Sequence, residues 1–240
     1  MEEYLKKARH EMEFWQHKML EEPSFFDRAA KRVQDKINKV IPEKVHQGIT
    51  AAIREMVRLV LFGSELTTAE PKKDASLFLR EAFVKQRIEF YKKTAATEGA
   101  IIGSGGILAG LAEFPILLAI KIKFLYEVAA LYGHDLKDYK ERVYVLYIFQ
   151  LTFSSQQERK KIAQKVFDWE NVSAGLPDDI KEFDWRIFQQ QYRDYMDLAK
   201  MAQLIPVIGA AVGAVVNYRL LTGLGETAMN AYRFRHFSSP

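Results

Sequence analysis

The sequence lacks cysteine altogether, since none occurs among its 240 residues. This absence excludes disulfide bonds, thiol nucleophiles and cysteine-ligated zinc, and it is compatible with a reducing cytoplasm. The N-terminal segment also lacks an apolar stretch, because residues 1–15 are highly charged. We therefore expect no signal peptide and a cytoplasmic location.

Catalytic motifs are absent as well. The sequence contains no HExxH, GxSxG or Walker motif, and no GxGxxG motif in a strand context. Residues 103–106 are not a phosphate-binding loop, because no Lys-Ser or Lys-Thr pair follows them. From these patterns we expect no cofactor and no metal site, and no catalytic residue can be assigned.

Five histidines offer the remaining scope for acid–base chemistry. Four of them lie on polar faces of expected helices or in the basic C-terminal tail: His10, His17, His46 and His236. His134 differs, because it lies between Gly133 and Asp135, and a neighbouring carboxylate can orient an imidazole ring. We interpret this tripeptide as a turn between helices, with a functional histidine as the alternative.

Charge of one sign is not in large excess either. The net charge of +4 is far from that of a dedicated nucleic-acid binder, so we expect no nucleic-acid partner. Basic residues do cluster in one segment: Lys72, Lys73, Arg80, Lys85, Arg87, Lys92 and Lys93. A solvated helix face explains this cluster, and attraction to an anionic membrane surface is the alternative.

Apolar residues recur at helical spacing along nearly the whole chain, and no strand pattern persists. The pattern predicts an all-α fold, a single multi-helix domain of about eight to ten helices around a central pair of glycine-rich apolar helices. Within residues 1–240 we expect amphipathic helices over 1–93, the glycine-rich pair over 94–133 and 201–225, and connecting helices over 134–200. One expected buried stripe consists of Val45, Ile49, Ile53, Met56 and Val60.

Several residues mark the expected helix ends. We expect Asp74 to cap a helix that runs into the glycine-rich stretch, and Pro115 to open a new helix after it. Gly133 suits a left-handed C-cap of that new helix. Three pairs of residues are expected to start later helices: Asp138 with Glu141 and Ser155 with Glu158 as capping boxes, and Asp179 with Glu182.

Glycine is concentrated in the two apolar stretches. Each glycine inside a helix costs about 1 kcal/mol relative to alanine, so close approach of two backbones is the expected compensation. Glycines four residues apart lie on one helix face and form a groove in which another helix can pack. The helix-packing pairs that we predict are Gly99 with Gly103, Gly106 with Gly110, and Gly209 with Gly213.

The glycine-rich pair has three interpretations. We favour the central hairpin of a water-soluble helical core; the alternatives are a pair that dips into a bilayer and a pair of full transmembrane spans. Length argues against full spans, because a span needs about 20 apolar residues. Glu113 and Pro115 interrupt the first run, and Arg219 closely follows the second.

Charged residues beside these runs need partners, because an unpaired ion in apolar surroundings is costly. Glu98 and Glu113 flank the first run, and Lys121 and Arg219 are the nearby cations. We therefore predict a Glu113–Lys121 or a Glu98–Arg219 ion pair. A structural role is favoured over a catalytic one.

A family resemblance rests on the same two stretches. Its residues are Glu98, Gly99, Gly103, Gly106, Glu113, Pro115, Lys121, Gly133, His134, Asp135, Gly209, Gly213, Asn217 and Tyr218. With these residues the chain resembles the EcsC family over most of its length. The resemblance implies association with an ABC transporter whose ATPase and membrane subunits are encoded alongside. It also implies a link to protein secretion and to proteolysis within the membrane, and it supplies no catalytic residues.

From the residues and the resemblance together, we expect a non-enzymatic accessory protein. Its expected partners are ABC transporter subunits or the inner face of the cell membrane. One alternative is a lipid- or peptide-binding module with a pocket between the glycine-rich helices. A second alternative is a hydrolase of unknown substrate that uses Glu98, Glu113 and His134.

Overall fold

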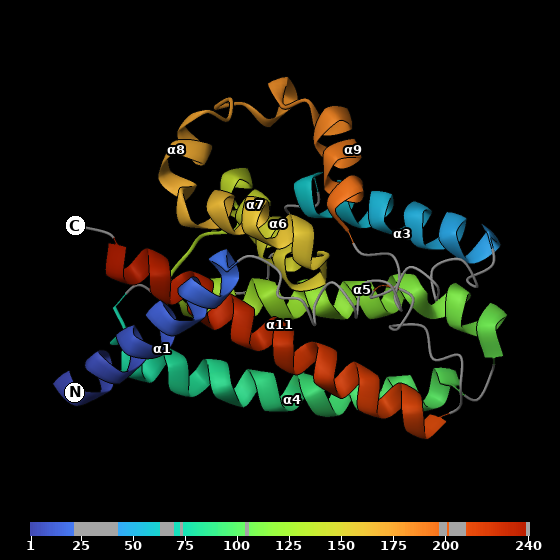
Figure 1. Cartoon of the computed structure of the whole chain (residues 1–240), viewed down its shortest axis with the longest axis horizontal. Coiled ribbons are helices and arrows are strands. Elements are labelled where there is room, and N and C mark those ends of the chain that lie inside the picture. The colour runs from blue at the N-terminus through green and yellow to red at the C-terminus, as the bar shows by residue number, and fades with distance from the viewer. Residues whose placement is uncertain are drawn as a thin grey trace.

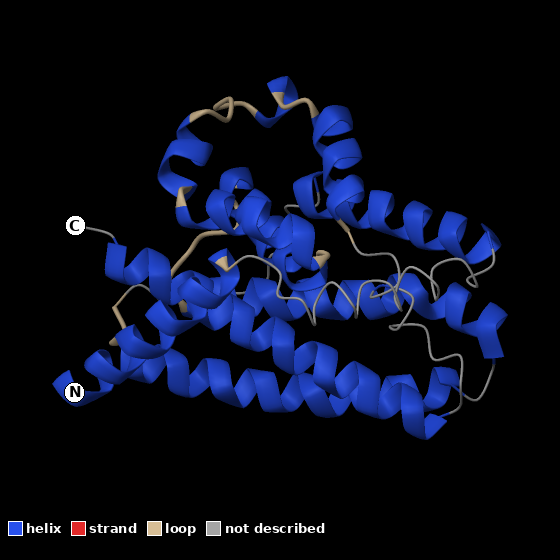
Figure 2. Ribbon diagram, in the orientation of Figure 1, coloured by secondary structure: helices blue, strands red, loops and turns tan. Residues whose placement is uncertain are grey.

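Helices make up the regular structure of the part of the chain that the computed structural model describes, which comprises residues 1–21, 43–62, 70–72, 74–103, 106–196, 201 and 210–238. They are α1 (Glu2–Leu20), α3 (Glu43–Phe62), α4 (Leu77–Gly103), α5 (Gly106–Leu131), α6 (Tyr139–Phe153), α7 (Gln156–Phe167), α8 (Trp169–Ala174), the 3₁₀ turn η2 (Ile180–Glu182), α9 (Trp185–Tyr195) and α11 (Ala210–Ser238). Within these ranges there is no strand, although one isolated bridge joins Ser154 and Met196 (Figure 2). The predicted all-α fold is confirmed.

The two longest helices, α4 and α11, lie side by side along one edge of the molecule (Figure 1) and make the most extensive contact among the described elements. Helix α5 packs against α4 on one side and against α3 on the other. Helix α6 contacts α3, α5, α7 and α11, while α1 crosses α11 and α7. The long C-terminal helix thus holds several earlier elements together.

Helix α6 is the most completely buried element of the described core. Buried side chains occupy every face of it, including Arg142 and Gln150 as well as the apolar residues. A helix that is apolar all round lies inside a protein. The stripe predicted on α3 is also buried, from Val45 to Val60, so the amphipathic pattern located this face correctly.

The end of α5 agrees with its prediction. Gly133 has a φ of 94°, in the left-handed region that glycine adopts without strain. Its N–H donates to the carbonyl of Ala130, and the N–H of His134 donates to the carbonyl of Ala129. This pair of hydrogen bonds is a Schellman motif, which satisfies two carbonyl groups at the helix C-terminus.

Two predicted helix caps are wrong, and a third is right only in part. Ser76, and not Asp74, accepts the cap hydrogen bond at the start of α4, from the N–H of Leu79. Asp179 caps only the short turn η2, and α9 starts later, with Asp184 as its N-cap. Asp138 caps α6 as expected and accepts from the N–H of Lys140. The expected capping box is not formed, because the carboxylate of Glu141 accepts from Arg235 instead.

Pro115 does not open a helix, because it lies inside α5. A proline within a helix removes one backbone hydrogen bond and crowds the preceding turn. Here apolar residues continue on both sides of the proline, and Phe114 and Leu117 are fully buried. Their burial offsets the cost, so the helix continues through the proline.

The glycine-rich stretches belong to three helices. Gly99 and Gly103 lie in α4, Gly106 and Gly110 lie in α5, and Gly213 lies in α11, whereas Gly209 is outside the described residues. The surroundings of these glycines are not described, so their packing stays a prediction. A close approach of α11 and α4 is observed further along α11, at Gly225, which the sequence analysis did not single out.

Gly225 and Gly223 give a matched pair of substitutions in α11. A Cβ atom at Gly225 would lie 2.8 Å from Cγ1 of Ile88 on α4, so we expect Gly225→Ala to lower the free energy of unfolding by about 1–3 kcal/mol. A Cβ atom at Gly223 would meet nothing within 4 Å. We therefore expect Gly223→Ala to raise the free energy of unfolding by about 0.5–1 kcal/mol. Urea denaturation of both variants tests this, and equal effects would contradict it.

Candidate functional site

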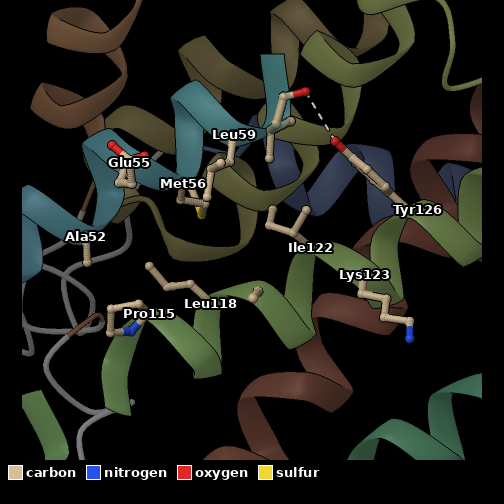
Figure 3. A pocket seen from close by; sticks show the side chains of 11 residues that line it. Ala52, Glu55, Met56, Leu59, Pro115, Leu118, Ile122, Lys123 and Tyr126 are labelled. Atoms are coloured by element: carbon tan, nitrogen blue, oxygen red, sulfur yellow. Dashed lines mark hydrogen bonds between the residues drawn. The ribbon is translucent and has the colours of Figure 1, made fainter. Parts of the chain in front are cut away.

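An apolar pocket of about 400 Å³ lies between α3 and α5. One wall consists of α3 residues and the opposite wall of α5 residues (Figure 3). The lining residues are Ala52, Glu55, Met56, Leu59, Val60, Pro115, Leu118, Ala119, Ile122, Lys123 and Tyr126. The volume lies within the range of about 300–1,000 Å³ that is typical of small-molecule sites.

The pocket offers few polar groups to a ligand. The hydroxyl of Tyr126 donates to the carbonyl of Val60 at 3.2 Å, and burial raises the pKa of this tyrosine (Figure 3). Glu55 is 3.5 Å from the guanidinium of Arg58, and the ammonium group of Lys123 points away from the other lining side chains in Figure 3. The arrangement therefore suits an apolar occupant better than a charged one.

The pocket also explains the position of Pro115. Proline gives α5 a rigid, exposed apolar surface at one end of this wall, close to Leu118. The prediction that Met56 and Val60 belong to a buried stripe is confirmed, whereas the alternative of a pocket between the glycine-rich helices did not include α3. Leu59, which lines the pocket, is one of two large apolar side chains that α3 exposes.

Two of the polar residues singled out in the sequence meet in the core. Lys121 of α5 and Asn217 of α11 are both fully buried, and Nζ of Lys121 lies 3.3 Å from Oδ1 of Asn217. Lys121 also donates to the carbonyl of Leu117 at 3.4 Å. The predicted Glu113–Lys121 ion pair stays a prediction. The contact that is observed ties α5 to α11.

The second predicted ion pair joins Glu98 and Arg219. The side chain of Glu98 lies outside the described part of the chain, so the Glu98–Arg219 pair stays a prediction. Arg219 is exposed on α11, and Glu113 is half-buried on α5.

His134 belongs to a polar cluster at the other end of α5. Its Nδ1 lies 3.4 Å from Oε2 of Glu141, and its ring stacks on Tyr232 with centroids 5.0 Å apart. Arg235 donates to both carboxylate oxygens of Glu141, at 2.7 and 2.8 Å. Asp135 only caps the turn, by accepting from the N–H of Lys137. Since Glu141 is fully engaged, the cluster clamps α6 to α11 and is poorly suited to proton transfer.

A second buried ion pair was missed by the sequence analysis. Glu81 of α4 and Arg233 of α11 form two hydrogen bonds, of 2.6 and 2.7 Å, in the interior. Glu11 also accepts from Arg233 at 2.8 Å. A signal existed, because Glu81 follows Leu77 by four residues and therefore lies on the inner face of α4.

Three members of the basic cluster are engaged within the protein. Arg80 donates to the carbonyl of Tyr132, and Lys92 is buried beside Glu89 at 2.7 Å. Arg87 lies 2.6 Å from Glu127. These three cations therefore stabilise the fold, whereas Lys72, Lys85 and Lys93 of the same cluster are exposed.

Two further properties concern the described residues only. Among them, no group of three or more histidine or acidic side chains is placed to hold a metal ion. None of their helices combines the length and the hydrophobicity that crossing a bilayer requires.

The structure thus defines an all-α protein whose C-terminal helix is anchored by buried ion pairs and which carries an apolar pocket between α3 and α5. The chain matches the EcsC protein family over residues 6–237, and it belongs to that family. It is 43% identical to Protein EcsC of Bacillus subtilis (strain 168) over 222 residues, which cover 92% of this chain and 91% of that protein. The family resemblance noted in the sequence is confirmed.

A more distant relative comes from the same organism. The chain is 25% identical over 247 residues to the Uncharacterized protein YdbA of Bacillus subtilis (strain 168), covering 94% of this chain and 90% of the relative. No solved structure matches the chain.

Proposed function

We propose that this protein is a non-enzymatic accessory protein of an ABC transporter, acts at the cytoplasmic face of the membrane, and is linked to protein secretion. The observation that carries the proposal is the apolar pocket between α3 and α5. Family membership supports the transporter association, which the resemblance implied, and the pocket supplies a surface that an apolar partner segment can occupy.

The surface around the pocket supports a docking role. Leu59 and Phe62 on α3 and Ile116 on α5 are exposed large apolar side chains near it in sequence. Contiguous exposed apolar surface on a soluble protein is typical of an interaction site. An apolar helix of a transporter subunit would cover these side chains and insert one or two residues into the pocket.

A lipid- or peptide-binding module is the second candidate, because the same pocket can hold an acyl chain or an apolar side chain. Its volume of about 400 Å³ and its apolar walls are compatible with either occupant. The two candidates differ in what remains bound after purification, namely a transporter subunit or a lipid.

Two adjacent alanines of α3 give a matched test. Ala52 lines the pocket, whereas Ala51 is exposed and does not line it. We expect Ala52→Phe to fill the pocket and to weaken co-purification with the transporter subunits encoded alongside by roughly tenfold, the effect of losing about 1.4 kcal/mol of binding energy. Ala51→Phe adds the same ring to the same helix and should leave co-purification unchanged.

Native mass spectrometry of the same preparations separates the two candidates. Lipid that accompanies the wild type and the Ala51→Phe variant, but not Ala52→Phe, would favour the binding module. If neither subunits nor lipid depend on Ala52, the pocket has no role in binding and the proposal fails.

A further inference from the structure

Helix α4 carries apolar side chains on two opposite faces. The inner face packs against α5 and α11, and its buried residues include Leu77, Val84 and Tyr91. The outer face exposes Leu79, Phe83 and Phe90, with 45%, 38% and 54% of their surface accessible. Side chains of this size are normally buried, so the second face needs an explanation.

The three outer side chains form one row. Spacings of four and seven residues place them on the same side of a helix, over a length of about 16 Å. Helix α4 forms an edge of the molecule (Figure 1), so the row faces outward along a single helix. A row on an edge helix can meet a flat surface at all three positions at once, whereas a protein partner would need a matching groove.

Cations accompany the row. Nζ of Lys72 lies 5.7 Å from the ring centroid of Phe83, and the guanidinium of Arg87 lies 5.5 Å from that of Phe90. Lys93 is exposed on the same side of the helix.

Two of the three carboxylates near the row are paired with cations. Glu89 pairs with Lys92 and Glu127 pairs with Arg87, while Glu70 shares a hollow with Lys72 beside Phe83. Phenyl rings flanked by lysine and arginine are typical of helices that lie in the interface of an anionic bilayer.

We propose that the outer face of α4 binds the surface of an anionic lipid bilayer, with Phe83 and Phe90 inserted among the lipid headgroups. Lys72 and Lys93 lie beside the phosphates in this arrangement, which is peripheral and involves no membrane span. The inference rests on the proposed membrane-side function, but it uses a face of the molecule distinct from the pocket between α3 and α5. An experiment can therefore contradict the bilayer contact without contradicting the role of the pocket, and the reverse.

Co-sedimentation with lipid vesicles tests the proposal. The probes are vesicles of phosphatidylcholine alone and vesicles containing about one third phosphatidylglycerol. We expect the wild type to bind the anionic vesicles, and the double variant Phe83→Glu/Phe90→Glu to bind them at least about tenfold more weakly. Lys93→Gln should weaken binding less and reduce its dependence on salt.

The matched control is Phe14→Glu. Phe14 is the most exposed phenylalanine of the described residues, with 69% of its surface accessible, and it lies on α1. This variant should bind like the wild type, and circular dichroism should show that all variants are folded. Equal loss of binding in Phe14→Glu, equal binding to neutral vesicles, or no binding by the wild type would overturn the proposal. Loss of transporter co-purification without any vesicle binding would instead make the α4 face a protein interface.

Discussion

Replacing Arg233 by methionine is expected to lower the free energy of unfolding by about 3–5 kcal/mol, because it leaves the carboxylate of Glu81 charged and buried without its cation. Glu81 has 0% of its surface exposed and Arg233 has 3%. Burial alone would lower the pKa of Arg233, but its hydrogen bonds and attraction to Glu81 outweigh burial and raise it. The pair is thus strongly coupled in the folded state, and urea denaturation at neutral pH measures the loss.

The hydroxyl groups around Glu81 cannot replace the guanidinium. Tyr4 and Tyr132 donate to the carboxylate at 2.6 and 3.2 Å, and neither carries a compensating charge. Burial is also the largest cause of the raised pKa of each tyrosine. Removal of Arg233 therefore leaves an ion that is hydrogen-bonded but not neutralised.

A double variant distinguishes the unpaired charge from lost packing. Glu81→Gln/Arg233→Met removes both charges and keeps most of the volume, so it should be clearly more stable than Arg233→Met alone. If the double variant is equally unstable, packing and not the buried charge causes the loss. The control is Lys6→Met, which breaks the exposed Glu2–Lys6 pair and should change stability by less than about 1 kcal/mol.

The sequence was sufficient for features that depend on neighbouring residues. The 3.6-residue period identified the buried stripe of α3, and the left-handed preference of glycine identified the end of α5 at Gly133. The start of α4 was placed wrongly because two residues, Asp74 and Ser76, compete as caps within one turn. Pro115 was misplaced because burial on both sides of it outweighs its local preference.

Contacts between distant helices could not be predicted in the same way. A pairing of Lys121 with the nearby Glu113 was expected, and the contact that the structure shows is with Asn217, 96 residues away. Glu81 and Arg233 are separated by 152 residues. Which turn of one helix faces which turn of another depends on the packing of whole helices. A single sequence therefore shows that a buried charge needs a partner, without showing where that partner lies.

The pocket and the outer face of α4 were missed for a related reason. An apolar residue such as Leu59 or Phe90 is expected inside a protein, and periodicity alone does not show that a second apolar face has nothing packed on it. In α4 apolar residues lie on two opposite faces, so they do not form the single stripe by which a helical period is recognised. Exposure became evident only when the neighbouring helices had been placed.

Replacing Glu141 by glutamine is expected to lower the free energy of unfolding by about 3 kcal/mol at neutral pH. Burial alone would raise the pKa of Glu141, but hydrogen bonds from Arg235 and His134 outweigh burial and lower it from an ordinary 4.5 to about 2. Only 13% of this side chain is exposed, so solvent screens the interaction weakly. The ionised carboxylate therefore stabilises the folded state.

The pH dependence follows from the sign of this shift. A carboxylate with a lowered pKa contributes its full stability above its unfolded value and loses that contribution as the pH falls through its folded value. The difference in stability between the wild type and Glu141→Gln should therefore be constant above about pH 4.5 and should shrink as the pH falls toward about 2. Urea denaturation at a series of pH values measures this difference directly.

An exposed carboxylate supplies the control for the pH series. Glu170 is exposed on α8, so Glu170→Gln should stay within about 0.5 kcal/mol of the wild type at every pH. A Glu141→Gln deficit that stays constant from pH 4.5 to pH 2 would mean that the variant loses packing or hydrogen bonds and not charge. In that case Arg235 and His134 would hold the side chain in place without stabilising its ionised form, and the clamp between α6 and α11 would be independent of pH.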